Sequence, residues 1–160
     1  MPLLQPIGIV DVFALTHSLY ARQKILGPPK AGVRYLVIDE AVVEEWQILK
    51  SFLSKLERLL EERSLDWHRT AAALRWLDPG VSLPWSPGIE GEIELHIGIV
   101  THPLSRLYAG PEIYSLGWGE MVLSAVGPRL MRSDVNSSEL RAVSLILTLK
   151  KTQADAGETA

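Results

Sequence analysis

One amphipathic segment, residues 40–63, constrains the fold of this chain more than any other. Its large apolar side chains recur at alternating intervals of four and three residues, which places them along one face of an α-helix. This stripe consists of Val42, Trp46, Leu49, Leu53, Leu56 and Leu60. Asp39 precedes the segment and can cap a helix by accepting backbone N–H bonds. The spacing therefore predicts a long helix with one apolar face.

Two uses of this apolar face remain open. Val43, Ile48, Phe52 and Leu59 make it wider than a coiled-coil seam, which favours a helix lying across its own sheet. Heptad spacing is also typical of a helix that pairs with a helix of another chain. If the protein binds a partner in this way, the stripe residues and Trp85, in a proline-rich loop, are the predicted interaction residues.

Three segments have patterns typical of β-strands. Residues 33–38 form a short apolar run rich in strand formers, which predicts a buried strand. Residues 139–151 also favour a strand, whose inward side chains would be Val143, Leu145, Leu147 and Leu149. Residues 89–101 alternate strictly, with the polar side chains Glu90, Glu92, Glu94 and His96 on one face. This alternation predicts a half-buried strand whose polar face is in water.

The other segments are less clearly patterned. Residues 7–26 favour a helix, although a strand over 7–14 competes with it. Residues 65–77, with three consecutive alanines, predict a second helix, and a loop follows to Gly88. The glycine-rich stretch 104–132 has no regular assignment.

Together these elements predict an α+β fold, in which a small mixed or antiparallel sheet is packed by a long amphipathic helix. The chain of 160 residues fits a single domain over 1–151, followed by a disordered tail at 152–160. No apolar run is long enough to span a membrane, and no signal peptide is visible, so we expect a cytoplasmic protein.

Composition excludes several kinds of chemistry. The chain has no cysteine, which removes disulfides, thiol catalysis and cysteine-based metal sites. Its formal net charge is −3, so broad binding to nucleic acid is not expected. A local basic stretch contains Arg22, Lys24, Lys30 and Arg34. That stretch is either a solvated loop edge or an anion site, and the sequence does not decide between them.

The candidate reactive residues are Glu92, Glu94, His96 and His102. Two carboxylates and an imidazole on one strand face can bind a metal or exchange protons, but any solvent-facing strand has a similar composition. No phosphate-binding loop, dinucleotide fingerprint, nucleophile elbow or paired-histidine spacing occurs. We therefore expect no cofactor and no metal, and an enzyme is the less favoured interpretation.

The order of elements resembles that of tail-terminator and neck proteins of long-tailed bacteriophages. The resemblance rests on an N-terminal helix, an extended segment at 33–37, a strand containing 92–97 and a closing strand over 139–149. It implies a small α/β domain that assembles into a hexameric ring, with no residue carried over, and a location in the virion if the gene is phage-encoded.

Two hypotheses of function follow. The favoured one is a non-catalytic structural or assembly protein that acts through homo-oligomerisation or another protein partner. By the resemblance above, it would be a component of a virion tail or neck. The alternative is a small metal-dependent enzyme or ligand-binding protein that uses the polar face of the strand at 89–101.

Overall fold

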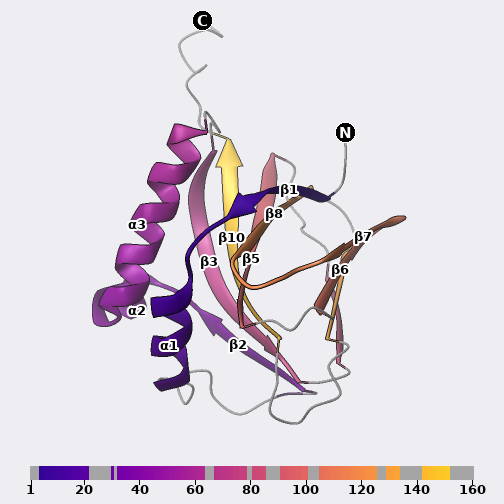
Figure 1. Cartoon of the computed structure of the whole chain (residues 1–160), viewed down its shortest axis with the longest axis horizontal. Helices are drawn as coiled ribbons and strands as arrows, with labels where there is room; N and C mark the ends of the chain where they lie inside the picture. The colour runs from indigo at the N-terminus through magenta and orange to yellow at the C-terminus, as the bar shows by residue number, and fades with distance from the viewer. Residues whose placement is uncertain are drawn as a thin grey trace, which may run out of the picture.

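The computed structural model describes residues 4–21, 30, 32–63, 67–78, 81–85, 91–100, 105–125, 129–133 and 142–151. Two antiparallel sheets pack face to face, and helices cover the outer face of the larger one (Figure 1). The larger sheet has the order β1 (Leu4–Ile9), β8 (Glu120–Ser124), β5 (Glu92–Val100), β10 (Ala142–Lys151), β3 (Trp67–Leu77) and β2 (Val33–Val37). The smaller sheet has the order β4 (Ser82–Trp85), β9 (Arg129–Ser133), β6 (Ser105–Ala109) and β7 (Glu112–Ser115).

The predicted α+β fold class is therefore wrong. A long amphipathic helix does pack on one face of a sheet, as expected, but the opposite face is covered by a second sheet. From β3 to β10, the chain passes repeatedly between the two sheets, so neither sheet is made of one continuous piece of sequence. Such pairing across long sequence separations leaves no local pattern from which it could be read.

The predicted helix at 40–63 is present in two pieces, α2 (Glu40–Glu45) and α3 (Gln47–Glu62). Asp39 caps α2 as predicted, since its carboxylate accepts the backbone N–H of Val42 at 2.9 Å. The helix breaks at Trp46, whose indole N–H donates to the Ser18 hydroxyl at 2.7 Å. This hydrogen bond joins the break between α2 and α3 to α1 (Phe13–Ala21), which contains Ser18.

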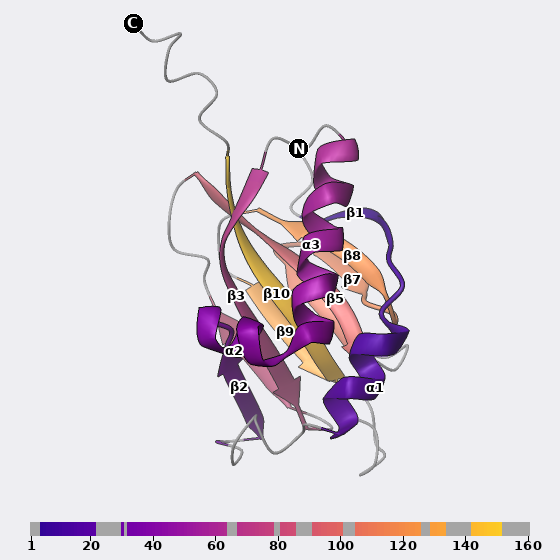
Figure 2. The same cartoon turned by 90° about the vertical axis from the view of Figure 1, so that its left-hand side faces the viewer.

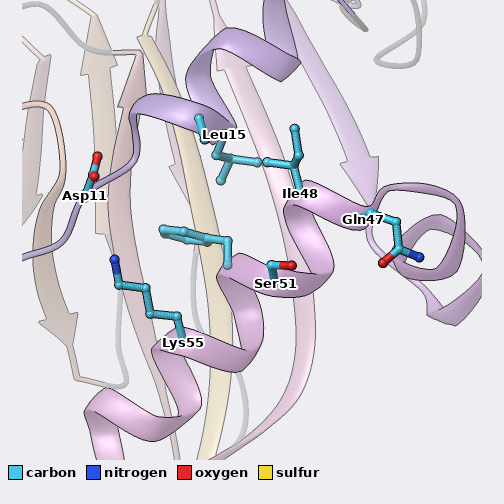
Figure 3. Close-up of a pocket in the computed structure, with 8 residues that line it drawn as sticks. Asp11, Leu15, Gln47, Ile48, Ser51 and Lys55 are labelled. Atoms are coloured by element: carbon cyan, nitrogen blue, oxygen red, sulfur yellow. The ribbon is translucent and has the colours of Figure 1, made fainter.

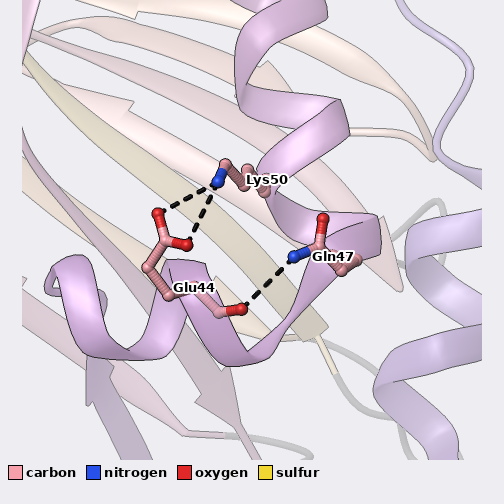
Figure 4. Close-up of polar contacts among 3 residues, drawn as sticks. All are labelled: Glu44, Gln47 and Lys50. Atoms are coloured by element: carbon pink, nitrogen blue, oxygen red, sulfur yellow. Dashed lines mark hydrogen bonds and ion pairs between the residues drawn. The ribbon is translucent and has the colours of Figure 1, made fainter.

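Polar contacts also join the two helical pieces across the break (Figure 4). The Lys50 ammonium lies 3.0 Å from the Glu44 carboxylate, and the Gln47 side-chain amide donates to the Glu44 backbone oxygen at 3.4 Å. Both lie at the protein surface, where such contacts are each worth at most about 1 kcal/mol. The indole at Trp46, buried at 1% exposure, contributes the larger share of the packing.

The apolar stripe of α3 faces the larger sheet, and Figure 2 shows the helix lying across its strands. Leu49 and Leu56 are fully buried, and Leu53 and Leu60 are nearly so. These side chains belong to one cluster with the outward residues of β3, β5 and β10. The stripe thus packs on the sheet of its own chain, and contact with another chain through it stays a prediction.

Residues 65–77 were predicted to be a helix, which is wrong. From Trp67 to Leu77 they form β3, which pairs with β10 on one side and β2 on the other. The consecutive alanines from 71 to 73 favour a helix locally, but the two rows of inter-strand hydrogen bonds override that preference. Small side chains suit this position because Ala72 lies beneath the helical layer.

The N-terminal helix at 7–26 was also only half right, because β1 occupies residues 4–9 and α1 begins at Phe13. Contact with Gly119 helps to explain why the chain leaves β1 at this point. The φ of Gly119 is +79°, and an added Cβ would lie 2.5 Å from the Val10 backbone oxygen. Val10 donates to the Gly119 carbonyl at 2.9 Å, so the close approach fixes the end of β1 against the β7–β8 turn.

The strands predicted at 33–38, 89–101 and 139–151 appear as β2, β5 and β10. The unassigned stretch 104–132 contains β6, β7, β8 and most of β9. Among the described helices, none is both long and apolar enough to cross a membrane.

Candidate functional site

The candidate site lies on the inner face of the larger sheet, the face that looks toward the smaller sheet. Ile146 and Val122 identify this face, because both belong to the cluster that joins the two sheets. His96 on β5 lies directly between them, opposite Ile146 on one side and Val122 on the other. Glu94, two residues away on the same strand, shares the face.

Glu94 and His96 form a polar pair in this interior. The Nε2 atom of His96 lies 3.2 Å from a Glu94 carboxylate oxygen, and the two side chains are 0% and 12% exposed. Two further hydroxyls share the face, because Ser124 lies opposite Glu94 and Ser144 lies two residues from Ile146. Both serines are buried, at 1% and 2% exposure. We call these four residues the inner polar cluster.

The predicted wet face of this strand is therefore wrong. Strict alternation correctly placed Glu92, Glu94 and His96 on one face, but that face is covered by the second sheet rather than by water. The burial deepens along the strand: Glu92 and Glu94 are partly buried, and His96 is fully buried. Burial of polar side chains costs free energy unless they are hydrogen-bonded, so such a cluster is unusual in a purely structural interior.

From this cluster the inner face stays buried across β10 and β3 and becomes exposed only at the β2 edge. One cross-strand row runs from His96 through Ile146 and Ala73 to Val37. The four residues are 0%, 4%, 7% and 58% exposed, in that order. The inner face is therefore buried at β5, β10 and β3 and exposed at the edge strand β2.

A cation lines the next row of this surface. Arg75 lies opposite Ser144 on one side and Tyr35 on the other, and its guanidinium lies 5.6 Å from the centre of the Tyr35 ring. Tyr35 itself is 51% exposed, at the open edge. The sequence pattern does not place Arg75 on the same face as His96, because residues 65–77 were predicted to be a helix.

A second polar pair, Tyr114 and Glu120, lies at the turn between β7 and β8. The tyrosine hydroxyl donates to one Glu120 oxygen, and the other oxygen accepts the Gly117 backbone N–H at 2.8 Å. Partial burial and then the Glu120 carboxylate raise the pKa of Tyr114 to about 12. Because both partners also fasten the turn, we regard this pair as structural.

The remaining predicted residues do not join the inner polar cluster. Glu92 lies on the same face as the cluster, but it is the first residue of β5 and lies opposite Lys150. His102 lies outside the described residues, as do Arg22 and Lys24 of the basic stretch. Trp85 is the last residue of β4. Two further members of the basic stretch are described: Lys30 is exposed, and the Arg34 guanidinium lies 5.5 Å from the centre of the Trp76 ring.

The strand order matches a known architecture. The chain from β3 to β10 builds two four-stranded layers, β3-β10-β5-β8 and β4-β9-β6-β7, and β1 and β2 extend the first. Eight antiparallel strands in two facing sheets are the framework of jelly rolls, the group that includes cupins.

Solved structures with the same arrangement support this assignment. A Pseudomonas putida prolyl-4-hydroxylase superposes with a TM-score of 0.66 at 12% identity, covering 93% of this chain and 92% of that one. The viral collagen prolyl hydroxylase of Paramecium Bursaria Chlorella virus-1, in its 2OG complex, gives 0.65 at 9% identity over 94% and 97% of the two chains. The non-heme alpha ketoglutarate dependent epimerase SnoN from nogalamycin biosynthesis gives 0.64 at 10% identity, over 92% and 76%.

The chain has a jelly-roll fold. At these identities the likeness shows the fold alone. Neither a family profile nor a curated protein matches the sequence.

The resemblance to bacteriophage tail-terminator and neck proteins is accordingly wrong. The three structures named above each superpose over more than nine-tenths of this chain, and none of them is a tail or neck component. The favoured hypothesis of a non-catalytic structural or assembly protein, with its virion tail or neck description, is contradicted by the same superpositions. The element order misled because β4, β6, β7, β8 and β9 went unrecognised and β3 was interpreted as a helix.

The described residues do not fit a non-haem iron site. Such sites use two histidines and one carboxylate on a shared iron. His17 is exposed on α1, on the outer side of the sheet, and His68 is exposed near the start of β3. Within the described ranges, no three His, Asp or Glu side chains come together as a metal site would require.

Proposed function

We propose that this protein binds a small polar molecule on the inner face of its jelly roll and that Glu94 and His96 exchange a proton with it. The carrying observation is the buried Glu94–His96 pair, at 3.2 Å, within a sandwich interior. A histidine beside a carboxylate is a common general acid–base arrangement, since the carboxylate orients the imidazole and stabilises its charged form. The assignment of the proton to one ring nitrogen depends on the tautomer.

The neighbouring groups favour a ligand with both polar and anionic parts. The hydroxyls of Ser124 and Ser144 can each donate and accept hydrogen bonds. Arg75, in the neighbouring row and on β3, next to the exposed edge strand β2, supplies positive charge. Tyr35 at the edge offers an exposed aromatic face. For a small organic acid on this face, the arginine lies nearer the exposed edge strand and the histidine lies deeper in the sandwich.

This proposal keeps the ligand-binding part of the alternative hypothesis and does not require a metal. The three fold neighbours are named as two prolyl hydroxylases and an alpha ketoglutarate dependent epimerase. Their chemistry is not transferred to this chain, because its described residues do not assemble the donors for iron. The proposed reaction is therefore proton exchange with a bound small molecule.

A thermal-shift screen of small carboxylic acids, amino acids, sugars and nucleosides would test the proposal, with calorimetry on each hit. We expect a hit whose affinity falls at least about tenfold in both Glu94→Gln and His96→Gln, equivalent to about 1.4 kcal/mol. His68→Gln is the matched control, because His68 is exposed on β3. Equal affinity in all four proteins would show that the ligand binds elsewhere.

A metal requirement can be examined in the same preparation. Elemental analysis of the purified protein, followed by the same screen with iron(II) and 2-oxoglutarate added, distinguishes the two cases. Stoichiometric metal that disappears in His96→Gln would replace our proposal with a metal-dependent one. A hit that needs neither addition supports the proposal as stated.

A further inference from the structure

A second surface lies on the opposite side of the larger sheet, where the helices are. Four of the seven exposed large apolar residues in the described part of the chain gather there. They are Ile9 at 73%, Phe13 at 65%, Trp118 at 52% and Ile48 at 42% exposure. We call these four residues the helical-side patch. Exposed apolar patches of this kind mark interaction sites more often than isolated apolar residues do.

The aromatic part of the patch is held in place. The Phe13 and Trp118 ring centroids lie 6.4 Å apart. The Trp118 indole N–H donates to the Thr16 hydroxyl at 3.0 Å, and that hydroxyl donates to the Ile99 backbone oxygen at 2.7 Å. An exposed indole that is fixed through a neighbouring helix to a central strand forms a preorganised contact, which lowers the entropy cost of binding.

Phe13 and Trp118 form an aromatic ridge, and a groove runs beside this ridge, between α1 and α3. Its first part has a volume of about 340 Å³, with Leu15, Ile48 and Phe52 among its apolar walls. A second hollow of about 280 Å³ continues along α3 toward Glu62. Asp11 and Lys55 line both parts, and Figure 3 shows the Lys55 side chain extending along the groove toward the segment that carries Asp11.

The charges around the groove are balanced. Two acids, Asp11 and Glu62, and two cations, Lys55 and Arg58, line its second part. The salt bridges found in the described part of the chain use other residues. Such a surface is complementary to an equal number of charges of both signs, and a rotated copy of itself carries that distribution.

We propose that this helical side is a two-fold interface at which a second copy of the same chain binds. Ridge and groove lie side by side on one face, so a two-fold rotation can place the ridge of each copy over the groove of the other. At about 200 Å² for each fully exposed large side chain, the patch leaves about 450 Å² of apolar surface in water. A stable dimer buries about 800 Å² on each partner, so the patch would supply more than half of such an interface.

This interface is independent of the proposed ligand site. The patch and groove lie on the outer, helical side of the larger sheet, whereas the inner polar cluster faces the smaller sheet. A failed ligand screen therefore would not contradict the proposed dimer. A monomeric protein would not contradict the proposed ligand site.

Sedimentation equilibrium on the full chain tests the interface. We expect a monomer–dimer equilibrium with a dissociation constant on the order of 10 µM. Phe13→Glu should weaken it at least about tenfold. The replacement is compatible with α1, because an acid is favourable in the first turn of a helix. Ile113→Glu is the matched control, since Ile113 is 60% exposed on β7, outside the patch. Equal effects of the two variants, or a wild-type monomer at hundreds of micromolar, would overturn the proposal.

A charge-exchange experiment identifies the occupant as a second copy. One variant carries Lys55→Glu and Arg58→Glu, and the other carries Asp11→Asn and Glu62→Lys. Asparagine retains the capping acceptor at position 11, which accepts the Phe13 N–H. Each variant alone should be monomeric through like-charge repulsion, and the mixture should form heterodimers. A mixture that stays monomeric contradicts a self-complementary interface, as would a monomeric wild type that binds anionic lipid vesicles through Phe13.

Discussion

Leu56 offers the sharpest test of how the helical layer is held. It is fully buried in the middle of the α3 stripe and belongs to the cluster beneath the larger sheet's helices. Replacing it by alanine removes three carbon atoms from the core, or about 2.4 kcal/mol of transfer free energy. The cavity left behind adds about 1 kcal/mol where neighbours do not collapse into it. We therefore expect Leu56→Ala to lower the free energy of unfolding by about 3.5 kcal/mol.

Urea unfolding followed by tryptophan fluorescence gives this quantity directly, because Trp46 and Trp76 lie in the same cluster. The matched control is Ile48→Ala on the same helix, where the side chain is 42% exposed and the expected loss is about 1 kcal/mol. Both should be measured well below the dimer dissociation constant. Equal losses in the two variants would refute the assignment of the stripe to a packed core.

Three further outcomes follow from local geometry. Gly119→Ala should destabilise by at least about 2 kcal/mol in urea unfolding, and more than Gly91→Ala, because both have positive φ but only Gly119 would contact a backbone oxygen. Tyr114 contributes stability that is fully present below pH 10 and is lost as the pH rises from 10 to its folded pKa of about 12, so Tyr114→Phe should flatten alkaline unfolding in that window. Asp39→Ala should cost about 1 kcal/mol by loss of the α2 cap, and Asp39→Asn much less, by the same assay.

The sequence predicted well what is local and periodic. The stripe from Val42 to Leu60, the cap at Asp39 and the alternation through Glu94 and His96 all correspond to real elements. Each depends on contacts within a few residues or on a repeat that matches one element. Even there, the helix break at Trp46 was missed, because it depends on a hydrogen bond to Ser18, far away in the chain.

The sequence could not show what packs against each face of a strand. Nothing in the pattern at 89–101 says whether its polar side meets water or another sheet, because both environments allow the same alternation. The second sheet arises from β4, β6, β7 and β9, all of five residues or fewer, which are too short to carry a distinct period. The sequence therefore named Glu94 and His96 as candidates, but it predicted neither their burial nor the position of Arg75 on the same face of the sheet.

The position of β10 at the centre of the larger sheet has a consequence for biosynthesis. It pairs with β3 and β5 along nearly its whole length, yet it is the last described strand to leave the ribosome. Until it emerges, β3 and β5 present open edges toward each other with no strand to join them, a state prone to association with other nascent chains. The larger sheet can therefore be completed only after β10 has been synthesised, and a chaperone that shields those two edges until then would raise the yield more than one that assists the helices.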